Sequence, residues 1–376
     1  MSIPVTGASP HGTLLCIETS CDDTSVALVR GGTVLSSVVS SQNELHAAFG
    51  GIVPEVASRR HTELLPAAVA EALRVAGLQW TGVDAVAVTV GPGLIGALLV
   101  GLAAAKATAY ALRLPLVPVN HLQGHIAASY ARQLPWGTPP APVEPPFVCL
   151  VASGGHTLLA VVEEGVTFRV AGRTLDDAAG EAFDKGARLL GLPYPGGAEL
   201  DRLAATGDPA AVRFPRAVPR GPDFSFSGLK TALLYYLREQ TDADVLAHKA
   251  DIAAGYQAAI VRQLVDKAVR CAEAEGLQTV AVAGGVAANS GLRAALAHEC
   301  ERRGLRSHLP PLALCTDNAA MIGLASAYLP SVPWPEYLAL DAYAAAAATS
   351  AAPRAAKRSA AKQEGHAVNR PPAPGC

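Results

Sequence analysis

The chain is predicted to repeat one succession of elements, and this repetition constrains its fold more than any other feature. Each half opens with two apolar runs joined by a short polar turn, at residues 14–18 and 24–29 in the first half and 147–151 and 157–162 in the second. Runs of this length bounded by turn residues predict an antiparallel β-hairpin at the start of each half.

Each half then has a further strand, a glycine loop and a helix. The strands are expected at residues 85–90 and 279–283, followed by GPGLIG and GGVAAN. The proline-rich residues 131–146 separate the halves and are predicted to connect them. The repeat is longer than that of solenoid proteins, so we expect two similar α/β lobes.

The order of elements predicts five segments along the chain, which are a disordered N-terminus (1–12), a first lobe (13–130), a connector (131–146), a second lobe (147–335) and a low-complexity, disordered tail (336–376). The last helix of the second lobe is able to pack back on the first. Two such lobes facing a common cleft resemble the duplicated ribonuclease-H-like plan of the actin-like ATPase and sugar-kinase (ASKHA) superfamily. This step is an analogy of fold and says nothing about function by itself.

One apolar segment raises the question of a membrane span. Residues 85–105 carry no charge over 21 positions, which is long enough to cross a bilayer. Gly91-Pro92-Gly93 interrupts the segment, so a strand, a turn and a buried helix are favoured. The start of the chain has no signal-peptide pattern, and its seven cysteines form no CxxC pair. We therefore expect a soluble protein of the reducing cytoplasm, without membrane contact.

Charge is spread unevenly along the chain. The tail from Pro353 onward holds five basic residues and one acid. Removing them leaves 25 basic and 31 acidic residues, so the body has a net charge near −6. Such a body is not expected to bind nucleic acid through bulk charge, and any RNA contact must be local or shared with partners.

Two histidines at a spacing of four are the first candidates for chemistry. The apolar residues 114–119 predict a strand, so His121 is expected to open a helix that also carries His125. Residues four apart lie on one helical face, where two imidazoles can share a metal ion. Neutral imidazoles suit iron, zinc or manganese better than magnesium. Taken alone, two histidines at this spacing more often occur by chance or pack in the core than bind a metal.

A carboxylate from elsewhere would complete a two-histidine, one-carboxylate set that leaves positions open for substrate. Asp317 precedes an apolar helix and is the candidate, although an acid in this place can equally be a helix N-cap.

Glycine loops are the candidate anion sites. Residues 153–157 (SGGHT) and 284–289 (GGVAAN) allow backbone N–H groups to approach a ligand closely, and the second loop precedes a helix. Asp184 and Asp201 are candidates to accept hydrogen bonds from ribose hydroxyls. Residues 50–61 and 224–230 are interpreted as loops, where Phe224 or Phe226 could stack on a base. Core packing is the expectation for at least one of these rings.

Several motifs together resemble the tRNA N6-adenosine threonylcarbamoyltransferase family of bacterial TsaD type, formerly described as O-sialoglycoprotein endopeptidases. The matching segments are IETSCDDTS (17–25), the run 106–126 that ends in HLQGHI, VASGGHT (151–157), GEAFDK (180–185), YPGG (194–197), FSFSGLKTA (224–232), AGGVAAN (283–289) and CTDNAAMIG (315–323). The resemblance covers residues from about 14 to 330.

This resemblance implies a metal site of His121, His125 and Asp317, with one divalent ion for each subunit. The ion is expected to be Fe2+, with Zn2+ or Mg2+ as alternatives. It also implies an adenylate site, with Asp201 as its neighbour, lined by Val151, Ala152, Ser153, Gly154, Gly155, Asp184, Gly197 and Asn289.

The implied reaction moves a threonylcarbamoyl group from L-threonylcarbamoyladenylate to N6 of adenosine 37, in tRNAs that read codons beginning with A, and releases AMP. No GxSxG nucleophile motif is present, so direct transfer is expected. Glu18 and Asp22, together with Asp23, are candidates to act as a base or as secondary metal ligands. The implied partners are tRNA, a paralogous TsaB-type subunit and a TsaE-type P-loop ATPase.

Three other functions remain as alternatives. A metal-dependent glycoprotease of zincin type needs HExxH, but Leu122 stands where the glutamate would be. A small-molecule kinase of the same superfamily would use Mg2+ with carboxylates. A non-enzymatic scaffold would have no need of the two histidines and Asp317.

Overall fold

Two five-stranded sheets of equivalent strand order form the centre of the protein. A computed structural model describes residues 12–215, 219 and 221–345. The first sheet has the order β3-β2-β1-β4-β5 and the second has the order β10-β9-β6-β7-β8. Their strands are β1 (Thr13–Glu18), β2 (Asp23–Arg30), β3 (Thr33–Ser41), β4 (Ala85–Gly91), β5 (Leu116–Asn120), β6 (Phe147–Ala152), β7 (Thr157–Glu164), β8 (Thr167–Arg173), β9 (Thr279–Ala283) and β10 (Arg306–His308).

Both predicted hairpins are confirmed. β1 pairs with β2 in antiparallel register from Thr13 opposite Arg30, and β6 pairs with β7 from Phe147 opposite Val162. β4 and β9 then join β1 and β6 in parallel, as the strand–loop–helix pattern of each half requires. The repeated order of elements in the sequence is therefore a repeated topology.

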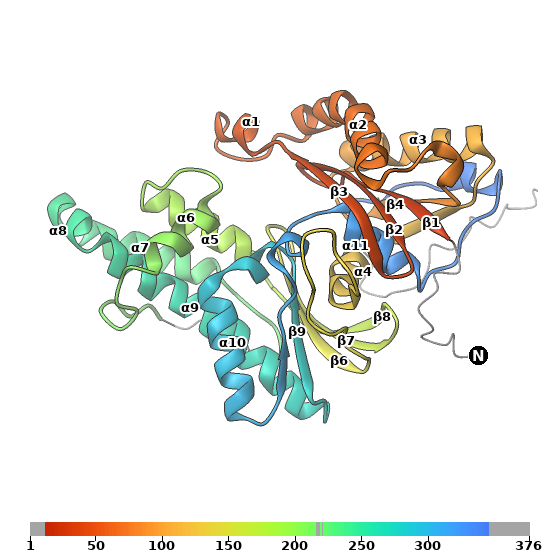
Figure 1. Ribbon diagram of the computed structural model, residues 1–376. Coiled ribbons are helices and arrows are strands. Elements are labelled where there is room, and N and C mark those ends of the chain that lie inside the picture. Colours follow the sequence, from red (N-terminus) through yellow and green to blue (C-terminus); the bar gives the residue numbers. More distant parts are fainter. Residues whose placement is uncertain (1–11, 216–218, 220, 346–376) are drawn as a thin grey trace, which may run out of the picture.

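Helices cover the outer face of each sheet, and two helices lie between the sheets (Figure 1). The α-helices are α1 (Asn43–Ala47), α2 (Pro54–Ala76), α3 (Ile95–Leu112), α4 (His121–Ala127), α5 (Ala179–Leu189), α6 (Gly196–Ala204), α7 (Ser227–Arg238), α8 (Asp242–Ala247), α9 (Lys249–Ala274), α10 (Ser290–Arg302) and α11 (Ala319–Ser326). Short 3-10 helices are η1 (Trp80–Gly82), η2 (Ala128–Tyr130), η3 (Gly285–Ala288), η4 (Leu312–Leu314) and η5 (Glu336–Ala339). α2 and α3 pack on the first sheet, α9 packs on the second, and α4 packs against α11 in the middle.

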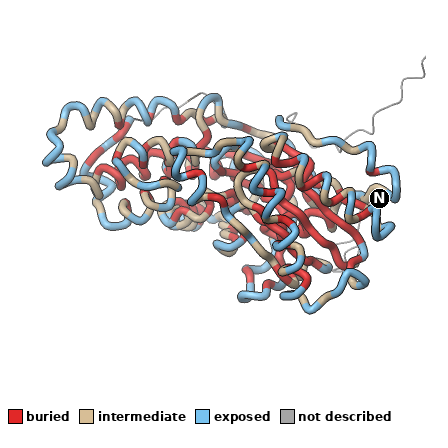
Figure 2. Tube along the Cα trace, turned by 90° about the horizontal axis from the view of Figure 1, so that it is seen from above, coloured by how far each residue is buried: buried red, intermediate tan, exposed pale blue. Residues whose placement is uncertain are grey.

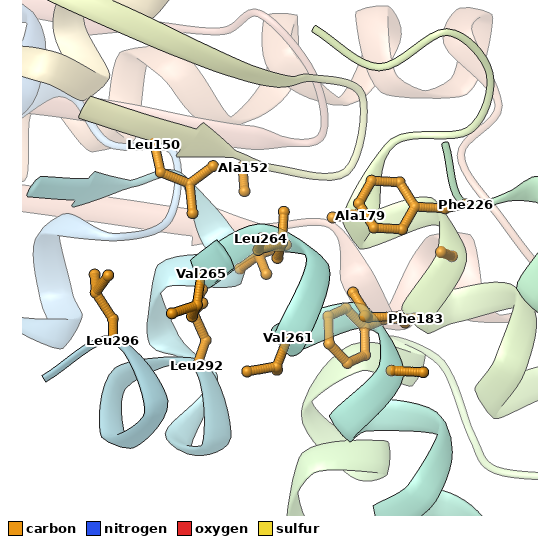
Figure 3. Close-up of a cluster of buried hydrophobic side chains, with 14 of the residues drawn as sticks. Leu150, Ala152, Ala179, Phe183, Phe226, Val261, Leu264, Val265, Leu292 and Leu296 are labelled. Carbon is orange, nitrogen blue, oxygen red and sulfur yellow. The ribbon is translucent and has the colours of Figure 1, made fainter. Parts of the chain in front are cut away.

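The alternation of side chains along the central strands divides the core into three layers. In β1, Leu15 and Ile17 face the helices of the first lobe, whereas Leu14 and Cys16 face the space between the sheets. Strands buried on both faces need continuous apolar runs, which explains the sequence of β1 and of β6. Figure 2 shows this buried interior, and Figure 3 shows the outer core of the second lobe, where Leu150 of β6, Phe183 of α5 and Leu264 of α9 belong to one cluster.

The segment that resembled a membrane span forms β4, a turn and α3. Within the described part of the chain, α3 is the helix with the length and hydropathy of a span, with a mean hydropathy of 1.7 and 33% of its window buried. One face of the helix is buried and packs on α2 and β4. Ile95 and Leu99 lie on its exposed side.

The connector and the start of the predicted tail both contact the first lobe. Residues 131–146 contain no helix or named strand, and their first part bonds to the start of β3, where Val34 N donates to Gln133 O at 3.0 Å. The tail was expected from residue 336, but residues 336–345 are ordered on the first lobe, where Tyr337 is fully buried. Aromatic packing outweighed the low-complexity composition there. Residues 1–11 and 346–376 lie outside the described residues.

Candidate active site

The two histidines stand on α4 as the spacing predicts. The helix begins at His121, and Asn120 caps it by accepting a hydrogen bond from Leu122 N at 2.8 Å. The imidazoles of His121 and His125 lie with their centroids 4.5 Å apart, and both are almost completely buried. α11 packs so closely on α4 that a Cβ at Gly124 would come within 2.8 Å of Ile322. The pair is therefore held in a rigid contact between the lobes.

Asp317 meets both histidines. Its Oδ1 lies 3.5 Å from Nε2 of His121 and 3.3 Å from Nε2 of His125. The N-cap of α11 is not Asp317 but Asn318, whose Oδ1 accepts a hydrogen bond from Met321 N. The carboxylate of Asp317 is thereby free for the cluster, and the helix-cap interpretation of Asp317 is wrong.

These three residues have the geometry of a metal site. One ligand atom from each residue lies within 4.8 Å of the others, so a single ion can reach all three. Among the described residues, Nδ1 of the buried His125 has no hydrogen-bond partner, and the polar group that its Nε2 meets is Asp317 Oδ1 at 3.3 Å. A buried imidazole without a partner is unfavourable, and a metal ligand bond would satisfy it. The residues present therefore fit a divalent transition metal.

The electrostatics of the cluster favour a cation. Burial alone would raise the pKa of Asp317, but His121 and His125 lower it below its usual value. Burial likewise opposes protonation of His121, yet Asp317 and Glu18 raise its pKa to about 9. Two carboxylates around two imidazoles hold a positive charge strongly, whether it is a proton or a metal ion.

A cavity of about 690 Å³ extends from this cluster into both lobes. From the predicted set it is lined by His121, Asp317, Asp22, Ser153, Gly154, Gly155, Asp184, Gly197, Asp201 and Asn289. His125 and Glu18 are fully buried and do not line the cavity. Val151 and Ala152 do not line it either, because they are buried residues of β6 directly before the glycine loop that does.

The glycine loop after β6 is open toward the cavity. Ser153 N donates to His156 O at 2.8 Å, and Ser153 Oγ accepts from His156 N, which closes a tight turn. A Cβ on Gly154 or Gly155 would meet nothing within 4 Å. The two glycines are therefore not required by packing in the free protein, and the space beside them is available to a ligand.

The polar side chains of the second lobe are held by hydrogen bonds. Asp184 accepts from Gly197 N at 2.9 Å, and burial raises its pKa. Asn289 caps α10 through Leu292 N, and Asp201 accepts from both the backbone N and the Oγ of Ser290. These hydrogen bonds hold the side chains in place along the wall of the cavity.

One lining residue was missed from the sequence. His156 was quoted only as part of a glycine loop, but its ring lines the cavity, and burial lowers its pKa to about 4. In the first lobe Asp23, one of the candidate bases named from the sequence, lines the cavity, and burial followed by the charge of Asp317 raises its pKa to about 7. Phe224 and Phe226 are both fully buried and stack on each other, so neither is available to a base.

Solved structures share the arrangement of two lobes. Full-length HypF in its phosphate- and nucleotide-bound form has a TM-score of 0.56 at 14% identity, over 86% of this chain and 47% of that one. Component A of the Acidaminococcus fermentans (R)-2-hydroxyglutaryl-CoA dehydratase has a TM-score of 0.50 at 18% identity, over 85% of this chain and 97% of that one. The likeness concerns the fold alone. The protein has the duplicated α/β fold of the ASKHA class with a metal-type cluster in its cleft, as expected.

The sequence narrows this class to one family. The model of the TsaD family, described as tRNA N6-adenosine threonylcarbamoyltransferase, matches residues 33–324. The chain belongs to this family. The enzyme of that name from Symbiobacterium thermophilum is 53% identical over 85% of this chain and 92% of its own length. The one from Geotalea uraniireducens is 51% identical over 84% and 90%.

Proposed function

We propose that this transferase moves the threonylcarbamoyl group of L-threonylcarbamoyladenylate to N6 of adenosine 37, in tRNAs reading codons that begin with A, and releases AMP. The observation that carries the proposal is the single cavity of about 690 Å³ that joins the glycine loop of one lobe to the His–His–Asp cluster. A pocket of this volume suits a ligand of acyl-adenylate size.

The second lobe would hold the AMP half of the donor. Backbone N–H groups of Gly154 and Gly155 border the cavity, and so does the N-terminal end of the 13-residue helix α10 at Asn289. Such groups suit a phosphate, whose negative charge grows as the acyl–phosphate bond breaks. Asp184 would accept a hydrogen bond from a ribose hydroxyl, and Gly197 and Asp201, which line the same cavity, would complete this wall.

His121, His125 and Asp317 would hold the metal. When bound, a divalent metal can polarise the carbamoyl carbonyl and neutralise charge on the adenylate, which contributes several kcal/mol to catalysis. The donor set favours Fe2+ or Zn2+ over Mg2+, because two of its three members are imidazoles. We propose Fe2+.

The transfer needs one proton acceptor. The N6 lone pair forms a bond to the carbamoyl carbon, the bond from that carbon to the phosphate oxygen breaks, AMP leaves with the electron pair, and N6 loses a proton. Asp22 lines the cavity, and burial raises its pKa, which makes it a better base than an exposed aspartate. Asp22 is our candidate for this role.

The partners follow from the charge and surface of the chain. The acidic body has little electrostatic attraction for tRNA, so a TsaB-type paralogue and a TsaE-type ATPase are proposed to complete the binding surface. Exposed apolar residues of α3, such as Ile95 and Leu99, would be covered in such an assembly. We propose that the enzyme acts in the cytoplasm.

Reconstitution tests the proposal. The purified chain, with Fe2+, the adenylate, unmodified tRNA and the two partner proteins, should produce threonylcarbamoyladenosine, measured by mass spectrometry of digested nucleosides. Chelation of the metal should abolish the product, and readdition should restore it. Full activity of a His121→Ala/His125→Ala variant would contradict the metal assignment. Metal-dependent release of peptides from a glycoprotein would favour the protease alternative instead.

A further inference from the structure

Glu18 is a carboxylate beside the His–His–Asp cluster that has no access to the cavity. It is the last residue of β1, and its side chain is fully buried. A buried carboxylate is unfavourable unless hydrogen bonds or charges compensate for the loss of water. Its partners therefore indicate what it does.

Both oxygens of Glu18 are occupied by groups from three different elements. Oε1 accepts a hydrogen bond from Ser20 N, in the turn after β1, at 2.5 Å. Oε2 accepts from Thr89 Oγ1, on β4, at 2.6 Å, and lies 3.0 Å from Nδ1 of His121 on α4. A carboxylate held in this way is poorly placed to take a proton from a substrate or to enter the coordination sphere of a metal.

The contact with Glu18 determines which nitrogen of His121 faces the cluster. An ionised carboxylate only accepts hydrogen bonds, so Nδ1 of His121 must carry the hydrogen. In the neutral ring that a metal requires, Nε2 then carries the lone pair, and it is Nε2 that lies 3.5 Å from Asp317 Oδ1. Ser20 Oγ lies 3.2 Å from the same Nδ1 and can accept from it as well.

The neighbouring histidine has no equivalent support. Within the described residues, Nδ1 of His125 has no hydrogen-bond partner, and its Nε2 meets Asp317 Oδ1 at 3.3 Å. In this part of the chain the first lobe therefore fixes the tautomer and ring orientation of His121 through Glu18 but makes no such contact with His125. This asymmetry suggests that the two ligands are not equivalent.

We propose that Glu18 is a positioning residue: it fixes the tautomer and direction of His121 for metal binding, and Thr89 holds Glu18 in place. The inference rests on the proposed metal-dependent function. It replaces the expectation that Glu18 is a base or a secondary ligand, since the side chain acts on the metal only through His121. Mutation of a carboxylate that orients a metal-binding histidine in this way typically weakens metal binding by about 10–100-fold.

Conservative variants separate positioning from folding. Glu18→Gln preserves the volume of the side chain but brings an NH2 group against either Ser20 N or His121 Nδ1, both of which donate. Thr89→Val removes one hydroxyl at constant shape, and Thr89→Ser restores it. Ser36→Ala is the matched control, because Ser36 is an equally buried hydroxyl of the first lobe that donates to Ala72 O away from the site.

The experiment is a Co2+ titration of the metal-free full chain, followed by visible absorption and checked by metal analysis. Glu18→Gln should weaken Co2+ binding by about 10–100-fold and shift the absorption bands, because the geometry of the imidazole ligand changes. Thr89→Val should weaken it by less, Thr89→Ser should match the wild type, and Ser36→Ala should change nothing. Thermal unfolding checks that each variant is folded.

Two results would overturn the inference. One is wild-type Co2+ affinity and spectrum in folded Glu18→Gln. The other is the absence of Co2+ binding by the wild-type chain. If Glu18→Gln lost transfer activity with unchanged metal binding, Glu18 would act on the substrate and not through His121. Failure of the proposed function is distinct, since the wild-type chain would then bind Co2+ with the expected variant pattern but modify no tRNA.

Discussion

The two lobes have the same topology but place different chemistry at equivalent positions. The turn after β1 contains Asp22, whose side chain borders the cavity, whereas the turn after β6 contains Gly154 and Gly155, which offer only backbone. Carboxylates suit a cation or an amine, and exposed N–H groups suit a phosphate. The duplicated fold thus places two equivalent turns at the cavity. The turn with a carboxylate suits positive charge, and the turn with exposed backbone N–H groups suits negative charge.

The metal ligands lie at equivalent ends of the two sheets, but the first lobe provides two ligands and the second provides one. His121 directly follows β5, the last strand of the first sheet, and Asp317 follows β10, the last strand of the second, after a loop. α4 and α11, which extend from these points, pack against each other between the sheets. A bound ion would therefore join the lobes, with two ligands from one and a single ligand from the other.

The largest effect should come from removing the second lobe's only member of the cluster. Asp317→Asn keeps the shape of the side chain but loses the negative charge, and Asn318 still caps α11. We expect metal content to fall and the transfer rate to drop by about three orders of magnitude, since a metal contributes several kcal/mol and 1.4 kcal/mol corresponds to tenfold. Metal analysis and initial rates measure this. Retained metal and rate would show that the histidines of the first lobe suffice.

A second prediction concerns the glycine loop after β9. Gly284 has a φ of +88°, and a Cβ there would lie 2.3 Å from the carbonyl oxygen of Ala152 at the end of β6. Gly284→Ala should lower the free energy of unfolding by about 3 kcal/mol, because both the backbone conformation and the neighbouring strand must adjust. Chemical denaturation is the measurement.

Gly285 provides the control for that prediction. It is adjacent, its Cβ would meet nothing within 4 Å, and its backbone does not need the left-handed region. Gly285→Ala should change the stability by no more than about 0.5 kcal/mol. Equal destabilisation by both substitutions would contradict the close packing of this loop on β6.

The sequence predicted the repeated topology and the helical start at His121 because these depend on local patterns. Apolar runs, glycine turns and the change from strand to helix at His121 can all be read from a few neighbouring residues. The role of Asp317 needed the family resemblance, because an aspartate before a helix is ordinary by itself. The start of α2 was missed: residues 50–61 were interpreted as a loop, yet Pro54 is the first residue of a 23-residue helix.

Contacts between distant segments could not be predicted from the sequence. Glu18 meets Thr89 and His121, which lie 71 and 103 residues away, and no local signal joins them. Residues 336–345 were assigned to a tail by composition, while Tyr337 and Tyr343 fix them to the first lobe. His156 was overlooked because its glycine neighbours explained the loop without it.

A smaller effect is expected at the glycine loop after β6 in the second lobe. Gly155→Ala places a methyl group where the structure has open space, so the free protein should fold normally. The methyl should obstruct the phosphate of the donor and raise the KM for the adenylate by about tenfold, which corresponds to about 1.4 kcal/mol. Steady-state kinetics at saturating tRNA measure it. An unchanged KM would mean that the donor phosphate lies elsewhere in the cavity, and the division of charge between the lobes would need revision.

The smallest effect concerns a support that only the first lobe has within the described residues. Tyr343 N donates to Val90 O at 2.9 Å, and its hydroxyl accepts from Nδ2 of Asn120, the cap of the metal-binding helix. Tyr343→Phe removes that one hydrogen bond and should lower the free energy of unfolding by about 1 kcal/mol. Tyr235→Phe, on the exposed side of α7, is the control and should have no measurable effect.

The KM for the adenylate should stay constant in both variants, because the donor half of the cavity belongs to the other lobe. A raised KM in Tyr343→Phe alone would indicate that the segment after η5 also shapes the cavity, where Ala344 contributes to its lining.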